Sequence, residues 1–210
     1  ETVRDAERLA LAARAAHAAG KPVVAYKLGR SRLGERLART HTGAIAGEDA
    51  ALDAYFRDCG IVRVDMLETL LEIPPLLAGR KPLDVPVGKV AVVTTTGGGA
   101  ASVVDRLGMR GVELAVPVMD LTMAAGAQDY GAALAKASKS DCHAVIACVG
   151  SSAQFHPDVA VHPIVASEKS KPVVASFTPQ PDRSLALAAS AGIAAFRTPE
   201  ACADGVAAFL

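Results

Sequence analysis

The chain has 210 residues, enough for one large or two modest domains; 51% are hydrophobic, with alanine and valine prominent, and only 4% are aromatic. This composition is typical of layered α/β domains with cores of small side chains. The 22 basic and 22 acidic residues balance, with no run of either sign, which argues against nucleic acid or an anionic membrane as the partner. No apolar run approaches the roughly 20 residues of a membrane span.

The termini and the cysteines indicate a cytoplasmic protein. The first residues, Glu1 to Asp5, do not resemble a signal peptide. The cysteines are scattered, with no CxxC pair and no spacing typical of metal ligands: Cys59, Cys142, Cys148 and Cys202. We therefore expect reduced thiols and no metal site.

The first part of the chain predicts helices that alternate with two short strands. Alanine and leucine dominate residues 2–19, and Gly20 with Pro22 ends that helix. The expected strands are 23–26 and 61–64, and the other expected helices are part of 29–40, then 48–59, and 66–78 with a break at Pro74 and Pro75. Residues 1–80 would thus form one α/β unit.

Residues 81–88 are rich in proline, glycine and charge, and predict a linker. A second unit, residues 89–210, follows with the same alternation. Its expected strands are 89–93, 113–116, 144–149, 173–177 and 193–196, and its expected helices are 100–108, 127–138, 158–169, 183–191 and 199–210. Strands alternating with helices indicate parallel sheets in layered α/β domains.

A short repeat suggests that the two units are related. Residues 20–25 match residues 170–175, and each copy is followed by a helix and then by Gly-Ile at the start of a strand. Because Lys21 and Gly60 are 39 residues apart, whereas Lys171 and Gly192 are 21 apart, the first copy carries 18 extra residues. A loop insertion beyond a parallel strand is a common place for catalytic groups.

The two copies differ in what precedes them. More than 80 residues lead to the second Lys-Pro strand from Lys89, but only 20 lead to the first. We therefore expect a fragment whose first domain is incomplete, with open sheet edges. No helix separates the strand ending at Val116 from the segment after Pro117, which predicts that a connecting segment is missing there.

A threonine- and glycine-rich turn follows the buried strand 89–93. Free amides and the helix dipole at such a helix start favour an anion such as phosphate. The residues expected to bind it are Thr95, Thr96, Gly97, Gly98, Gly99 and Ala100. The turn is neither a Walker A motif nor a GxGxxG fingerprint, and an ordinary tight turn is the alternative interpretation.

His41 lies in the inserted segment, between Thr40 and Thr42 and ahead of Gly43. A solvated loop histidine is the simplest interpretation. Combined with an anion site, however, an uncrowded imidazole suits a nucleophile that accepts a phosphoryl group. Lys27 and Arg30, beyond the first strand, are candidates to contact phosphate or CoA, although we expect solvated charges there.

Residues 21–31, 40–47 and 60–65 resemble the second domain of NDP-forming acyl-CoA synthetases, relatives of succinyl-CoA synthetase that include acetyl-, pimeloyl- and feruloyl-CoA ligases. The resemblance implies two flavodoxin-like three-layer domains, the first one incomplete. It also implies that His41 becomes phosphohistidine, that Glu1 steadies it, and that Thr42, Gly43 and the glycine-rich turn face the phosphate.

The chain departs from this family's pattern in having no counterpart of the CoA-binding Rossmann domain or the ATP-grasp domain. The resemblance therefore implies that CoA and ATP or ADP with Mg are bound largely by another domain or subunit, and that the fragment alone is inactive. Two alternatives remain: a non-catalytic flavodoxin-like module that binds an anion or a subunit, and a flavodoxin with FMN, against which the scarcity of aromatics argues.

Overall fold

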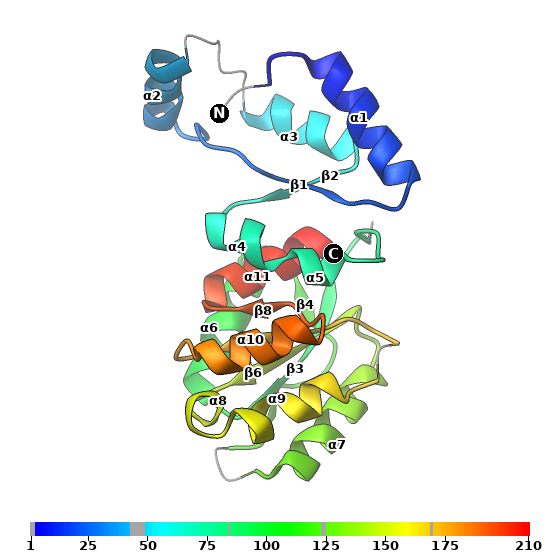
Figure 1. Ribbon diagram of the computed structural model, residues 1–210, viewed down its shortest axis with the longest axis vertical. Coiled ribbons are helices and arrows are strands. Elements are labelled where there is room, and N and C mark those ends of the chain that lie inside the picture. The colour runs from blue at the N-terminus through cyan, green and yellow to red at the C-terminus, as the bar shows by residue number, and fades with distance from the viewer. Residues whose placement is uncertain (1–2, 43–48, 84, 123–124, 169) are drawn as a thin grey trace.

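The computed structural model describes residues 3–42, 49–83, 85–122, 125–168 and 170–210, with the side chains of 38–42 outside the description. Its strands form a two-stranded and a six-stranded sheet, both parallel. Figure 1 shows the smaller sheet and its helices stacked above the larger one. The α/β class with parallel sheets is confirmed.

The first sheet pairs β1 (Val23–Tyr26) with β2 (Ile61–Val64), Val23 opposite Ile61. One of its faces is covered by α1 (Ala6–Ala18) and α3 (Asp49–Asp58), because alternate strand residues turn toward these helices. The small core there contains Ala13, Phe56, Cys59 and Ile61. Helix α2 (Arg32–Thr42) stands beside this layer, away from the strands (Figure 1).

The opposite face of the first sheet packs onto the second part of the chain. Pro74 ends α4 (Leu67–Glu72) and begins α5 (Pro74–Leu77), because proline lacks the amide that a continuing helix needs. These helices lie against α11 (Pro199–Phe209) (Figure 1). One core cluster joins residues of both parts, among them Val62, Val64, Ile73, Leu76, Leu77, Val92, Phe196 and Phe209.

The second sheet has the order β4-β3-β6-β7-β8, with β5 also paired to β3. Its strands are β3 (Lys89–Thr94), β4 (Glu113–Leu114), β5 (Met119–Asp120), β6 (Ala144–Val149), β7 (Val173–Phe177) and β8 (Ala195–Phe196). Helices α6 (Gly97–Gly108) and α11 cover one face. The other face is covered by α7 (Ala127–Ser138), α9 (Pro157–Val165) and α10 (Asp182–Ser190), and α8 (Ser152–Phe155) follows β6.

The edge beside β3 corrects one expectation. Strand β4 pairs with the beginning of β3 and β5 pairs with its end, so both lie on the same side of β3. The chain between them contains Pro117, which cannot donate a ladder hydrogen bond. The expectation of a missing connecting segment here is wrong, because one interrupted edge strand accounts for the pattern.

The repeat is visible in strand register. Ala25 pairs with Arg63 in the first sheet, and Ala175 pairs with Ala195 in the second. Ile61 and Ile193 are separated by the same number of residues as Arg63 and Ala195, so these residues are equivalent in the two copies. The two Lys-Pro strands thus meet their Gly-Ile strands in the same register, as a duplication predicts.

Glu72 of α4 and Asp204 of α11 are separated by that same number of residues and are therefore equivalent positions. Each of these two acids accepts hydrogen bonds from the other part of the chain. Glu72 accepts hydrogen bonds from the Arg197 amide at 3.2 Å and from Arg197 Nη1 at 2.5 Å. Asp204 Oδ2 accepts from the amides of Asp65 and Met66 at 2.9 and 3.1 Å. Each acid therefore caps the end of the other part's last strand; we call this pair the reciprocal caps.

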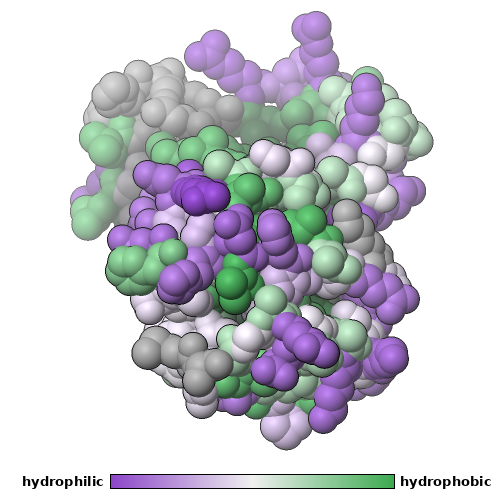
Figure 2. All heavy atoms as spheres, turned by 60° about the horizontal axis from the view of Figure 1, so that its bottom comes forward, coloured by the Kyte–Doolittle hydropathy of each residue, from purple (hydrophilic) through white to green (hydrophobic). Residues whose placement is uncertain are grey.

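Figure 2 shows the end of the molecule that carries the second sheet, where hydrophilic and hydrophobic side chains are interspersed in small groups. Within the described ranges, every helix is too short or too polar to span a lipid bilayer.

The division into domains 1–80 and 89–210 with a linker at 81–88 stays a prediction. The Leu83 amide, in the linker segment, donates to the Phe209 carbonyl at 2.7 Å.

Candidate functional site

The glycine-rich turn supplies a helix start with unused donors. Helix α6 begins at Gly97, three residues earlier than expected, and the Ala100 amide makes its first helical bond, to the Thr96 carbonyl at 3.0 Å. The first amides of a helix have no partner within it. In the described part of the chain, no hydrogen bond from the amides of Gly97, Gly98 or Gly99 is present. These three donors lie at the positive end of the helix dipole.

Close packing explains two glycines around this turn. A Cβ at Gly99 would lie 2.8 Å from Thr96 Cγ2, and one at Gly150, after β6, would lie 2.9 Å from Thr96 Cβ. Both separations are too short for real side chains, so Thr96 is held between two glycine backbones. The turn thus brings the carboxyl ends of β3 and β6 together.

The other threonines mainly tie the turn together. Thr94 Oγ1 accepts from the Thr96 amide and donates to the Thr96 carbonyl, at 2.9 and 2.8 Å. Thr95, which is buried, accepts from the Gly150 amide at 3.3 Å. The methyl group of Ala100 lies in the core. Of the predicted phosphate-binding residues, Thr96 and Gly97 to Gly99 therefore offer the donors that the turn leaves available.

Two side chains that the sequence analysis did not single out border this helix start. Asp120 Oδ2 lies 3.6 Å from the Cβ position of Gly97, and Thr178 Oγ1 lies 3.8 Å from that of Gly99. Asp120 comes from β5, a two-residue strand with no sequence signal, and Thr178 follows β7. Because a carboxylate and an anion compete for a helix start, Asp120 would weaken anion binding there.

The histidine segment differs from the expected loop. Ser31 Oγ accepts from the Gly34 amide at 3.1 Å and starts α2, which continues through Thr42. The backbone of His41 and Thr42 is therefore the last turn of a helix, and the expectation of a loop at these two residues is wrong. Their side chains, together with Glu1 and Gly43, lie outside the described residues. His41 sits on the first sheet's side of the molecule, and the glycine-rich turn sits on the second sheet.

Ion pairs anchor both ends of the histidine segment. Arg30, ahead of α2, pairs with Asp49, the first residue of α3, at 3.3 Å. Arg63 of β2 pairs with Asp49 and, at 3.4 Å, with Asp53. Partial burial opposes ionisation of Asp49, but the guanidinium groups of Arg63 and Arg30 outweigh it and hold its pKa below the ordinary value.

The ion pairs continue into the second part of the chain. Asp65, after β2, pairs with Arg30 and also with Arg110 at 2.9 Å. Arg110 follows α6 and pairs in turn with Asp204 of α11 at 3.0 Å. These ion pairs thereby connect the segment that carries His41 to the carboxyl end of α6. The amino end of α6 holds the glycine-rich turn.

Lys27 departs from the expectation of a solvated charge. It follows β1 and is only 8% exposed. Its ammonium donates to the Leu28 carbonyl at 2.8 Å, and no ion pair of Lys27 is present in the described part of the chain. Arg30, the other cation singled out here, is engaged by two carboxylates.

Two further features lie away from these groups. A cavity of about 500 Å³ opens between β2, α3, the 81–88 segment and α11, and its lining includes His17, Arg57, Arg63 and Leu83 but no residue of the glycine-rich turn. The described residues contain no group of three or more His, Cys, Asp or Glu that would hold a metal ion. The four cysteines are free and buried.

The comparisons with known proteins agree with the geometry. Residues 1–77 match the family of succinyl-CoA ligase-like flavodoxin domains. The chain is 35% identical over 96 residues to the alpha subunit of an ADP-forming acetate–CoA ligase II from Pyrococcus furiosus, covering 45% of this chain and 20% of that subunit. It is 36% identical over 97 residues to a trans-feruloyl-CoA synthase of an unknown prokaryotic organism, covering 46% and 13%.

A solved structure extends the likeness to the whole chain. The dinucleotide-forming acetyl-coenzyme A synthetase 1 of Ca. Korarchaeum cryptofilum, in complex with phosphate and ADP, has the same fold with a TM-score of 0.76 and 22% identity, covering all of this chain and 50% of that one. The chain thus spans half of that structure, and its alignments to these two curated relatives span a fifth or less of them.

The fold and the family match define residues 1–77 as a succinyl-CoA ligase-like flavodoxin domain. Through this part, the chain is similar to ADP-forming acyl-CoA ligases.

Proposed function

We propose that this chain is the phosphoryl-carrying part of an NDP-forming acyl-CoA ligase. The overall reaction would convert acyl-CoA, phosphate and NDP into carboxylic acid, CoA and NTP, reversibly. The observation that carries the proposal is the family match over residues 1–77, because these residues include the inserted segment with His41.

His41 would act as the phosphoryl carrier. Phosphate displaces CoA from the acyl-CoA and gives an acyl phosphate; an imidazole nitrogen of His41 then forms a bond to phosphorus while the carboxylate leaves. Attack by the NDP on the phosphohistidine forms NTP and frees the imidazole. Glu1 would accept a hydrogen bond from the other ring nitrogen and fix the attacking tautomer.

The glycine-rich turn would hold the phosphoryl oxygens. Within the described residues, the amides of Gly97, Gly98 and Gly99 and the hydroxyl of Thr96 remain available to donate at the positive end of α6. Thr42 and Gly43, next to the histidine, are the proposed contacts on the other side of the phosphoryl group. Backbone donors suit this task because they are held rigidly by the helix and need no reorganisation when charge develops.

CoA, the nucleotide and Mg²⁺ would be bound largely by other domains or subunits. A CoA-binding Rossmann domain and an ATP-grasp domain are the proposed partners. The described residues offer no cluster of metal ligands, so the Mg²⁺ would enter with the nucleotide. We expect that the 210 residues alone do not synthesise acyl-CoA from acid, CoA and ATP.

Radiolabelled ATP tests the proposal. The chain is combined with its nucleotide-binding domain or subunit, incubated with γ-labelled ATP and Mg²⁺, and assayed for an acid-labile, base-stable label. Wild type and a His162→Ala control, which alters an exposed histidine, should carry the label, and His41→Ala should not. An unlabelled wild type with a folded nucleotide-binding domain would instead favour a non-catalytic anion-binding or subunit-binding module.

A further inference from the structure

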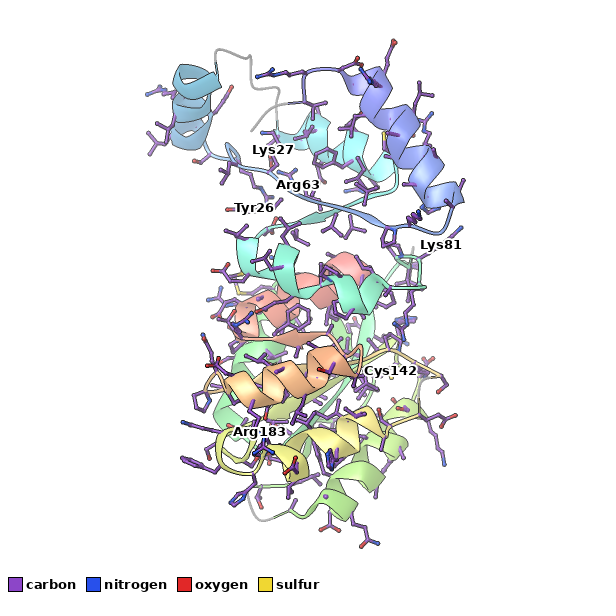
Figure 3. All side chains as sticks on the ribbon, viewed as in Figure 1. Tyr26, Lys27, Arg63, Lys81, Cys142 and Arg183 are labelled. Carbon is purple, nitrogen blue, oxygen red and sulfur yellow. The ribbon has the colours of Figure 1, made fainter. Side chains whose placement is uncertain are left out.

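Lys27 is a buried cation that the reaction scheme above does not use. Side chains alternate along β1, so Tyr26 turns toward α4 and Lys27 toward the α3 side, where Arg63 also lies (Figure 3). Lys27 is 8% exposed, and its ammonium has three hydrogen-bond donors. One donates to the carbonyl of Leu28, the next residue. The described part of the chain supplies no partner for the other two.

The nearby carboxylates are engaged by arginines. Asp49 and Asp53 pair with Arg63, whose side chain is 7% exposed. Asp65 follows Val64, which pairs with Tyr26, so its backbone lies across from Lys27 in register. Its two carboxylate oxygens are nevertheless taken by Arg30 and Arg110. The arginines of this cluster are therefore neutralised by acids, whereas no acid of the described ranges pairs with Lys27.

An ammonium removed from water is costly unless an anion and further hydrogen bonds replace its hydration. One neighbouring carbonyl replaces only part of it. A buried lysine with spare donors at the carboxyl end of a parallel strand is therefore suited to a ligand anion, since ligands of such sheets bind at that end.

We propose that Lys27 is a ligand-binding residue whose ammonium holds the oxygens of a phosphoryl group beside the histidine segment. That the anion is the phosphoryl group carried by His41 rests on the proposed function. The existence of the anion site rests on the burial and pairing of Lys27 alone.

Phosphate binding and thermal stability together test this site in the 210-residue chain. Inorganic phosphate is titrated calorimetrically, in the Gly98→Asp background so that α6 does not contribute. Lys27→Met should bind phosphate at least tenfold more weakly than its parent, and Lys27→Arg should retain most of the affinity. The matched control is Lys21→Met, which removes an exposed lysine just ahead of the same strand.

The melting temperature without phosphate separates a ligand site from an internal ion pair. If Lys27 awaits a ligand, methionine removes an uncompensated buried charge, and Tm should hold or rise. A fall in Tm would assign the ammonium to a carboxylate of the chain and overturn the proposal. Absence of phosphate binding in the parent, or equal binding in Lys27→Met, would overturn it as well.

The assembled ligase distinguishes this inference from the proposed function. If His41 becomes labelled but Lys27→Met leaves the KM for phosphate unchanged, only the role of Lys27 is refuted. If His41 is never labelled while Lys27→Met loses phosphate binding, the reaction is refuted and the anion site stands.

Discussion

Gly98 is the residue through which the anion site of α6 can be tested most directly. A Cβ at Gly98 meets no atom within 4 Å, so a side chain can start there without displacing neighbours. Gly98→Asp places a carboxylate at the positive helix start. We expect about 0.3–1 kcal/mol of stabilisation in thermal melts and at least a tenfold loss of phosphate affinity at the start of α6 in calorimetry, with binding at Lys27 retained.

The same helix provides the control. Gly108, at the other end of α6, also has open space around its Cβ position. Gly108→Asp adds the same charge far from the helix start and should leave phosphate affinity unchanged. Equal losses in both variants would mean that net charge, and not a site at Gly97 to Gly99, governs binding.

Asp49 predicts how stability depends on pH. Its pKa is lowered in the folded protein by Arg63 and Arg30 against the effect of burial. The resulting stabilisation is complete above the unfolded value of about 3.9 and disappears as pH falls through the lower folded value. The unfolding free energy from urea melts should therefore drop as pH is lowered from 5 to 3.

Asp49→Asn should be less stable than wild type at pH 7 and should flatten that acid slope. Asp141→Asn is the comparison, because Lys89 lowers the pKa of Asp141 as well, but on the surface. Screened surface pairs contribute little, so its slope should stay near that of wild type. An unchanged slope in Asp49→Asn would contradict the predicted role of this carboxylate.

At the scale of elements, α4 depends on a cap from another helix. Its N-cap residue, Met66, offers no side-chain hydrogen bond, and the amides of Asp65 and Met66 donate instead to buried Asp204 of α11. Asp204→Ala leaves these donors unpaired and removes one of the two carboxylates that pair with Arg110. We expect a loss of about 3 kcal/mol in chemical denaturation.

Glu200→Ala is the control on the same helix, since the ion pair of Glu200 among the described residues is a solvent-exposed one with Arg106 at 3.6 Å. Its cost should stay below about 0.5 kcal/mol. Glu72→Ala should match Asp204→Ala, because it removes the other reciprocal cap. A cost for Asp204→Ala no larger than that of Glu200→Ala would contradict this account of α4.

Elements with strong local signals were predictable from the sequence. Strands β1, β2, β6 and β7 and helix α7 begin and end where the sequence predicted, because apolar runs or helical periodicity meet glycine, proline or polar turns there. Helix α6 starts early because tertiary packing overrides the low helix propensity of its glycines. Strand β5 and helix α8 were missed because two and four residues carry too weak a pattern.

The site was predictable only in part. The glycine-rich turn follows from local sequence, and the histidine segment was found by motif and insertion length. The contacts of Asp65, Asp120 and Asp204 join residues far apart in the chain, and no periodicity signals such pairs. Burial of Lys27 was missed because a lysine beside a loop usually remains solvated.

At the scale of the whole molecule, the two sheets share one core. Ile73, Leu76 and Leu77 belong to the same buried cluster as Phe196 and Phe209, so the predicted boundary near residue 80 separates segments that bury each other's surface. We expect one cooperative unfolding transition with coincident calorimetric and spectroscopic midpoints. Two separated transitions would indicate domains that are independent in stability.

The reciprocal caps also make the chain resemble a two-fold dimer joined end to end, in which each subunit contributes the helix that completes its neighbour. A polypeptide cut between residues 81 and 88 would then remain assembled. Residues 1–80 and 89–210 produced separately should combine into a native-like heterodimer, which size-exclusion chromatography would detect, whereas either piece alone should expose the apolar surface that the other normally covers. A substitution on the contact surface of one piece would then need a compensating substitution in the other, so the two pieces would have to evolve together.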